Sequence, residues 1–270
     1  MISRRTATQG AVALALGLPA SGKAETAAEK HHTFVLVHGA WHGGWCWKMV
    51  GEYLRAQGHT VFIPTMTGLG EKSHLASADI SLDTHIADIS NLLIWEELEN
   101  VILVGHSYGG GIISGVCDAH KERIAHAIYL DAIVPKSGDT MIGGATIEDA
   151  EKRLGPFVDG YLAPPRAPVS FGIPETMTED LAWVRRRVTP HLVGTWTQAF
   201  SFKNGGSDGL PRTFIYCSDK PTPSPQQDAR LQSYRDDPSW MYDELPCGHD
   251  AMVILPTETA QMFERIADRA

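Results

Sequence analysis

From Thr33 onward, the chain alternates between short runs of β-branched and other apolar residues and longer amphipathic segments. This alternation is typical of a parallel sheet whose strands are connected by helices. We expect strands over residues 33–38, 60–64, 101–106, 126–131, 212–217 and 240–245. The hydrophobic pattern therefore predicts an α/β fold with a six-stranded, mainly parallel sheet flanked by helices.

Two helices are expected from the 3.6-residue period and from their end residues. Ser81 can cap a helix that places Ile86, Ile89 and Leu93 on one buried face. The last helix is expected over residues 256–266, beginning at a proline, which suits the first turn.

Residues 134–209 interrupt this rhythm, because they are rich in proline and contain no clear strand. We expect a cap inserted after the fourth strand. Its aromatic side chains either line an apolar substrate chamber or pack the cap onto the sheet. The aromatic residues considered for the substrate pocket are Trp41, Phe157, Tyr161, Trp183 and Trp196.

The first 32 residues differ from the rest of the chain. Arg4 and Arg5 precede an uncharged stretch over residues 10–20 that is too short to span a bilayer, and small residues follow. This order is typical of a twin-arginine export signal and linker, which predicts a periplasmic or secreted protein. The alternative is an Ala-rich tail on a cytoplasmic protein. The folded domain is expected over residues 33–270.

The composition of the chain excludes several kinds of partner. The chain has 270 residues, 43% of them hydrophobic, and a formal net charge of -9. An acidic chain without an extended basic patch indicates that neither nucleic acid nor an anionic membrane is a partner. The four cysteines lie far apart with no C-x-x-C pair, so no metal site is expected.

The stretch Gly105-His106-Ser107-Tyr108-Gly109 follows the apolar run 101–104 and leads into a helical segment. A serine in a G-x-S-x-G pattern between a strand and a helix lies on a sharp turn that exposes its hydroxyl. Ser107 is therefore the candidate nucleophile.

A serine hydroxyl needs a base to accept its proton and a carboxylate to orient that base. His249 follows the last strand, where the loop reaches the carboxyl edge of the sheet. Asp219, after the fifth strand, is the favoured acid, and Asp131, at the end of the fourth strand, is the alternative. The backbone N–H of Tyr108 and one N–H from the loop after the first strand, residues 38–45, are expected to form the oxyanion hole.

These motifs resemble a known family. The stretch from Val37 to Trp45, the serine motif and Gly248-His249 look like the α/β-hydrolase group that contains plant methyl esterases, hydroxynitrile lyases and bacterial esterases acting on xenobiotics. The resemblance implies Ser107, Asp219 and His249 as a catalytic triad on an α/β-hydrolase fold over residues 33–270. It also implies that the N–H groups of Ala40 and Tyr108 form the oxyanion hole.

We therefore expect a serine esterase that cleaves small, largely uncharged carboxylic esters or carbamates, without cofactor or metal. Two alternatives remain. Hydroxynitrile lyases of this group use a threonine after the first strand and a lysine after the base, where this chain has Ala40 and Asp250. A ligand-binding protein that keeps the fold without catalysis is the other.

Overall fold

The computed structural model describes residues 30–220 and 223–269. The predicted export signal therefore lies almost entirely outside the described residues. Six strands form one parallel sheet in the order β2-β1-β3-β4-β7-β8, which confirms the predicted sheet. Their bounds are β1 (Thr33–Val37), β2 (Thr60–Phe62), β3 (Val101–His106), β4 (Ile124–Leu130), β7 (Arg212–Cys217) and β8 (Met241–Leu245).

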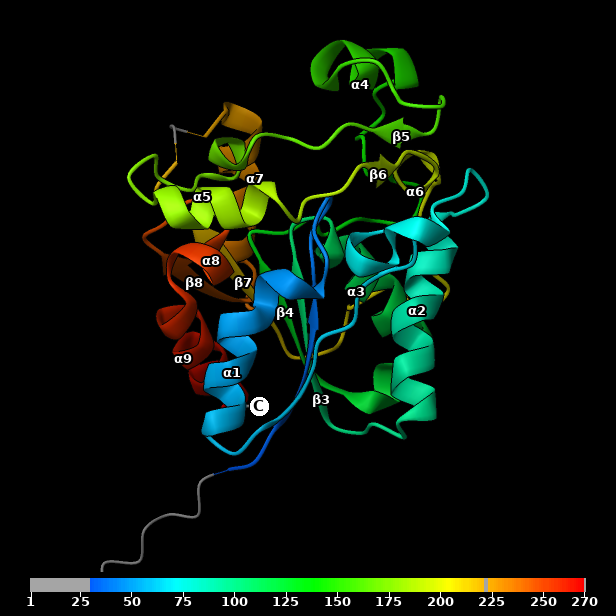
Figure 1. Ribbon diagram of the computed structural model, residues 1–270. Coiled ribbons are helices and arrows are strands. Elements are labelled where there is room, and N and C mark those ends of the chain that lie inside the picture. Colours follow the sequence, from blue (N-terminus) through cyan, green and yellow to red (C-terminus); the bar gives the residue numbers. More distant parts are fainter. Residues whose placement is uncertain (1–29, 221–222, 270) are drawn as a thin grey trace, which may run out of the picture. The chain divides into compact units, whose positions relative to one another are not determined.

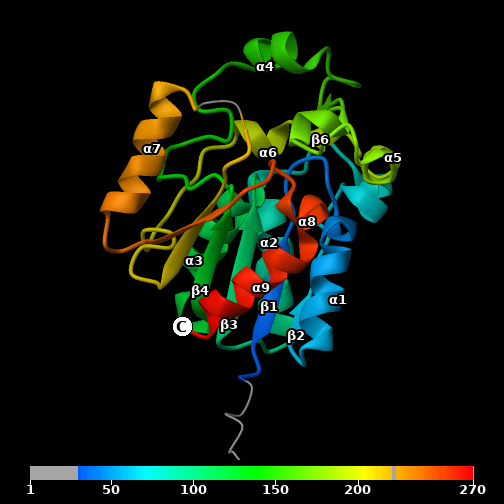
Figure 2. The same ribbon diagram turned by 90° about the vertical axis from the view of Figure 1, so that its left-hand side faces the viewer.

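Helices cover both faces of the sheet, as Figures 1 and 2 show. One face carries α1 (Lys48–Ala56), α8 (Ala251–Ile254) and α9 (Pro256–Ala267), and the other carries α2 (Leu82–Trp95), α3 (Gly109–Ala119) and α7 (Pro225–Asp236). Each face has its own buried apolar cluster. Both layers are needed, because strands such as β3 are buried along their whole length.

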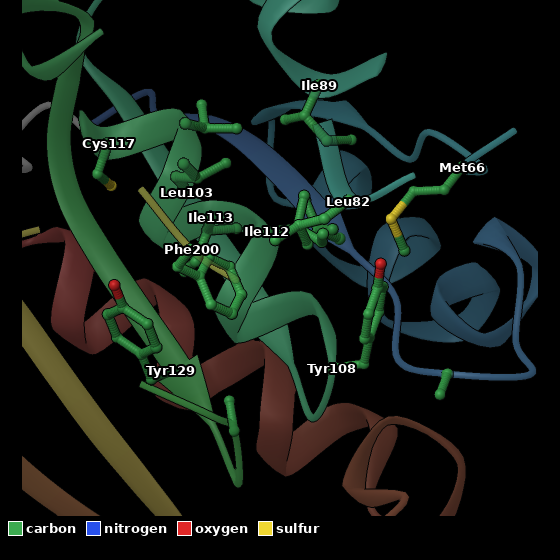
Figure 3. Close-up of a cluster of buried hydrophobic side chains, with 14 of the residues drawn as sticks. Met66, Leu82, Ile89, Leu103, Tyr108, Ile112, Ile113, Cys117, Tyr129 and Phe200 are labelled. Carbon is green, nitrogen blue, oxygen red and sulfur yellow. The ribbon is translucent and has the colours of Figure 1, made fainter. Parts of the chain in front are cut away.

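The predicted helices form for the expected reasons. Ser81 is the N-cap of α2, and its backbone N–H donates to the Thr84 hydroxyl. Ile89 and Leu93 are fully buried. Figure 3 shows Ile89 in the cluster that α2 and α3 form above the sheet. The amphipathic period therefore identified the face of α2 that packs against the core.

The segment between β4 and β7 forms smaller elements beyond the carboxyl ends of the strands (Figure 1). Its helices are α4 (Ile147–Leu154), the short 3-10 helix η4 (Pro168–Phe171), α5 (Thr178–Arg185) and α6 (Gly194–Thr197). Strands β5 (Leu162–Ala163) and β6 (His191–Leu192) pair antiparallel, where the sequence had indicated no strand. They were missed because each has two residues, too few to show a period.

None of the helices in the described ranges is both long enough and apolar enough to cross a membrane.

Candidate active site

Ser107 lies on a sharp turn between β3 and α3, with a backbone φ of 53°. Non-glycine residues rarely adopt this left-handed conformation, and such strain is typical of functional sites. The two motif glycines make the turn possible. A Cβ on Gly105 would lie 2.6 Å from the Gly109 carbonyl oxygen, and one on Gly109 would lie 2.7 Å from the His38 carbonyl oxygen.

Two backbone hydrogen bonds join this turn to the loop after β4. The Ser107 N–H donates to the Leu130 carbonyl at 3.2 Å, and the Ile133 N–H donates to the Ser107 carbonyl at 3.0 Å. Asp131 lies between these two partners in the chain. The turn that exposes the serine therefore also places Asp131 next to the site.

His249 lies in the loop between β8 and α8, with its side chain 27% exposed. The cap holds this loop closely, since a Cβ on Gly248 would lie 2.2 Å from the Gly172 carbonyl oxygen. The Asp250 N–H also donates to the Phe171 carbonyl at 3.0 Å. Contacts with the cap thus fix the loop that carries the histidine.

The Nδ1 atom of His249 is hydrogen-bonded to the carboxylate of Asp131. Asp131 is only 8% exposed, and both of its oxygens also lie 2.6 Å from the Lys220 ammonium. Burial alone would raise the pKa of Asp131, but the hydrogen bond from His249 and the charge of Lys220 lower it well below its usual range. Asp131 is therefore a carboxylate shared by two cationic or hydrogen-donating partners.

The expectation that Asp219 would orient His249 is corrected by this arrangement. Asp219 is exposed, and its backbone N–H donates to the Cys247 carbonyl at 3.0 Å. Its carboxylate makes no hydrogen bond or ion pair with any residue that the structure describes. The loop after β7 contributes the ammonium of Lys220 to the site, and the carboxylate comes from the loop after β4.

The two expected oxyanion donors come from the serine turn itself, at Tyr108, and from the loop after β1, at Ala40. No acceptor within residues 30–220 and 223–269 bonds the backbone N–H of Ala40 or of Tyr108, so both can donate to a ligand. The loop of Ala40 approaches the nucleophile closely, since a Cβ on Gly39 would lie 3.1 Å from the Cβ of Ser107. The next residue, Trp41, has a φ of 64°.

Cap residues hold Trp41 in this conformation. The Trp41 N–H donates to Nδ1 of His191 at 3.2 Å, and the Thr189 N–H donates to the Trp41 carbonyl at 2.9 Å. The side chain of Tyr108 is also anchored, by a 2.8 Å hydrogen bond between its hydroxyl and Nδ1 of His85. Figure 3 shows Tyr108 within the buried cluster beside Met66. The loop and the turn that carry the two N–H groups are therefore both fixed by side chains around them.

Ser107 and His249 line one cavity of about 120 Å³. Of the aromatic residues considered for the pocket, Trp41 lines this cavity, together with Phe171 and Arg166 from the cap. Trp196 packs edge-on against Trp41 at 5.3 Å rather than lining it.

The other aromatic residues considered for the pocket lie elsewhere. Phe157 is buried in the apolar cluster, and the backbone carbonyl of Tyr161 accepts a hydrogen bond from the N–H of Val193 at 2.9 Å. Trp183 lines a separate cavity of about 470 Å³ beside Met49. Trp183 also packs edge-on against Trp45 of the body, with ring centroids 5.0 Å apart, so this side chain packs the cap onto the sheet domain.

The two histidines that flank the sequence motifs have structural contacts. His38 donates from Nδ1 to the Gly39 carbonyl and accepts from the Met66 N–H, and burial lowers its pKa to about 3. His106 donates from Nε2 to the carbonyl of His249 at 3.0 Å, and burial likewise lowers its pKa to about 3. Both rings are therefore neutral near pH 7 and serve as hydrogen-bonding parts of the core.

Two features of the site were missed by the sequence reasoning. Lys220 follows Asp219 directly, and nothing in the hydrophobic pattern distinguishes a lysine that reaches inward from one in solvent. The second is a hydrogen bond of 3.0 Å between His42 and Asp250, which are 1% and 0% exposed. In the sequence, His42 lies two positions after Ala40, and Asp250 directly follows His249. These positions beside two expected site residues are the signal that could have indicated the pair.

Comparison with known proteins identifies the family of this chain. The chain belongs to the α/β-hydrolase family, because the model of the alpha/beta hydrolase family matches residues 34–268. This confirms the resemblance inferred from the sequence motifs.

Among curated proteins, the chain is 38% identical to a carbendazim-hydrolysing esterase from Nocardioides sp. (strain SG-4G), over 84% of this chain and 96% of that protein. It is 27% identical to methylesterase 1 of Arabidopsis thaliana, over 89% of this chain and 97% of that protein. Among solved structures, an extracellular α/β-hydrolase from a Paenibacillus species has a TM-score of 0.72 at 20% identity, covering 88% of this chain and 98% of that one. This last similarity concerns the fold alone.

Proposed function

We propose that this protein is a serine hydrolase that cleaves small, largely uncharged carboxylic esters or carbamates through an acyl-enzyme on Ser107. One observation carries the proposal: Ser107 and His249 face the same cavity, and His249 is hydrogen-bonded through Nδ1 to the buried carboxylate of Asp131. Nucleophile, base and orienting acid are the three groups that acyl transfer to a serine requires.

The hydrogen bond of His249 determines which ring nitrogen is basic. A carboxylate only accepts hydrogen bonds, so Nδ1 carries the hydrogen that is donated to Asp131. Nε2 is then the nitrogen that accepts the proton of Ser107 as its oxygen attacks the ester carbonyl. Asp131 stabilises the imidazolium formed in this step and holds the ring in one orientation.

The backbone supports the charge that develops on the substrate. When the ester carbonyl becomes tetrahedral, its oxygen carries a negative charge that the N–H groups of Ala40 and Tyr108 stabilise. His249 then donates the proton to the leaving alcohol as the acyl-enzyme forms. Water next attacks the acyl carbon, His249 accepts a proton from this water, and the proton passes to Oγ of Ser107 as the carboxylic acid leaves. The acid in this scheme is Asp131, where the resemblance implied Asp219.

The substrate class rests on the cavity and on the relatives. A cavity of about 120 Å³ around Ser107 suits a small group at the reacting carbon. The relatives named as a carbendazim-hydrolysing esterase and a methylesterase support the assignment to the carboxylic ester hydrolases. The first of these names also supports carbamates as substrates, since it refers to carbendazim hydrolysis.

The lyase alternative is less favoured by the site. Release of cyanide needs a cation beside the base, but the residue after His249 is Asp250, whose carboxylate is fully buried and bonded to His42. The non-catalytic alternative is opposed by the two N–H groups that lack acceptors within the described residues and by the strained turn at Ser107. Both features are costly in a protein that only binds a ligand.

Covalent labelling with a fluorophosphonate probe tests the proposal. The wild-type protein is expected to be labelled on one serine, and Ser107→Ala is expected to abolish labelling and ester hydrolysis. Ser170→Ala is the matched control, because Ser170 lines the same cavity but its hydroxyl donates to the Ala167 carbonyl. An unlabelled wild type, or a Ser107→Ala variant labelled as fast as the wild type, would contradict the proposal.

A further inference from the structure

A buried pair of side chains joins the two loops that carry the base and one oxyanion donor. Nε2 of His42, in the loop after β1, lies 3.0 Å from Oδ2 of Asp250, in the loop after β8. Their side chains are 1% and 0% exposed, so water does not compete for this contact. The residues are 208 positions apart in the chain, and only the fold brings them together.

The surroundings of His42 determine its protonation. Its Nδ1 lies 2.8 Å from the Ala40 carbonyl oxygen, which can only accept a hydrogen bond. Its Nε2 faces the carboxylate of Asp250. Both ring nitrogens therefore have an acceptor as partner, which is the arrangement that a doubly protonated imidazolium requires.

The electrostatics agree with this geometry. Burial alone would lower the pKa of His42, but the carboxylate of Asp250 raises it. Burial would likewise raise the pKa of Asp250, and His42, with smaller contributions from His106 and His249, lowers it. Both shifts favour the ion pair over the neutral pair.

The pair lies where three parts of the proposed site meet. Ala40, whose carbonyl accepts from His42, supplies one proposed oxyanion donor through its own N–H. Asp250 directly follows His249 in the chain. A third buried ring, His106, precedes Ser107, donates to the His249 carbonyl and lies 4.0 Å from the other oxygen of Asp250.

From this geometry we propose that His42 and Asp250 are positioning residues. As a buried ion pair, they fix the loop that carries Ala40 relative to the loop that carries His249. The inference rests on the proposed function. Neither residue donates to the substrate, because both hydrogens of the His42 ring are used by protein acceptors. A buried ion pair gives little net stability compared with apolar residues of the same size, so its contribution here is to geometry.

The first test measures the charge of His42 directly, by ¹⁵N NMR of the histidine rings in the intact protein at pH 8. The wild type is expected to show an imidazolium pattern for one histidine, which His42→Gln removes. Asp250→Asn is expected to convert that ring to neutral imidazole. A wild type in which every histidine is neutral at pH 8 would overturn the ion pair, and this readout does not depend on esterase activity.

The second test separates kcat from KM on a small neutral ester. In His42→Gln and in Asp250→Asn, kcat is expected to fall about 10- to 100-fold, because small misplacements of catalytic groups are costly. KM is expected to stay within about threefold, because Asp250 does not line the cavity and both ring hydrogens of His42, which does line it, are donated to protein acceptors. The double variant is expected to lose no more than the worse single variant, because the two residues act as one unit.

His126→Gln is the matched control for loss of a buried histidine. His126 is fully buried and hydrogen-bonded to Thr213, but at the far end of the sheet strands. This variant is expected to keep kcat within about twofold while losing stability. A folded His42→Gln variant with the kcat of the wild type would refute the positioning role. Because Ser107→Ala and fluorophosphonate labelling test the serine hydrolase separately, a failure of either proposal can be told from a failure of the other.

Discussion

The loops after β4 and β7 follow neighbouring strands, and each has a candidate carboxylate among its first two residues, but the two carboxylates have different surroundings. Asp131 directly follows β4, has a φ of 45° and is bonded to His249 and Lys220. Asp219 lies two residues beyond β7 and its side chain is exposed. Because β4 and β7 pair directly, the two loops share one edge of the sheet, but the carboxylate that reaches the histidine is the buried one, Asp131.

The comparison also shows a division of roles. The loop after β4 supplies the negative charge, and the loop after β7 supplies Lys220, whose ammonium holds that charge and lies 4.5 Å above the Tyr216 ring. A buried carboxylate shared by an imidazole and an ammonium is more firmly placed than one with a single partner. We therefore expect substitutions in either loop to disturb the position of the Asp131 carboxylate.

The largest expected effect distinguishes the two carboxylates directly. Asp131→Asn is expected to lower kcat by about 10³- to 10⁴-fold, because an amide no longer holds His249 in the correct tautomer. Asp219→Asn is expected to change kcat by less than about threefold. Steady-state kinetics on one ester measures both variants, and the opposite ranking would return the role of acid to Asp219.

Lys220→Met, a substitution in the loop after β7, is expected to have an intermediate effect on activity. Without the ammonium, the Asp131 carboxylate loses the two 2.6 Å contacts that fix its place, so it orients His249 less well. The kcat is expected to fall about 10-fold, between the effects of Asp131→Asn and Asp219→Asn. The control is Lys136→Met, since Lys136 is exposed in the loop after β4 and should leave kcat unchanged. A Lys220→Met variant with the kcat of the wild type would exclude this role.

The smallest effect on activity is expected for a substitution at the opposite end of β4 and β7, away from the site. His126 in β4 bonds Thr213 in β7 at 2.9 Å, and burial lowers its pKa from 6.5 to about 4. Between these pH values the unfolded chain binds a proton that the native state does not, so stability falls as the pH drops.

His126→Gln removes this difference in proton binding. The free energy of unfolding of the variant is therefore expected to change less steeply between pH 6.5 and 4 than that of the wild type. Urea unfolding at several pH values measures the slopes, and kcat is read as a control. Equal slopes would mean that His126 is protonated in the native state, whereas a large loss of kcat would show that this end of the strands influences the site.

Features of the site were predicted where several consecutive residues form a pattern, and were missed where a single residue or a pair of residues is involved. The strands at residues 101–106 and 212–217 were predicted with the bounds that the structure shows, because runs of buried apolar residues define them. The turn at Ser107 and the place of His249 followed from their positions after strands. The two-residue strands β5 and β6 and the inward reach of Lys220 have no comparable pattern, since both depend on packing between distant segments.

The sequence by itself determined the parallel sheet, the serine turn and the loop that carries the histidine, because each follows from a local period or a short motif. Only the tertiary structure decided which carboxylate meets His249, which pocket aromatics face the cavity and that His42 pairs with Asp250. These outcomes depend on how deeply each side chain is buried and in which direction it points at the shared edge of the sheet. A hydrogen bond forms only when donor and acceptor lie about 3 Å apart, and the spacing of residues along the chain does not specify such distances.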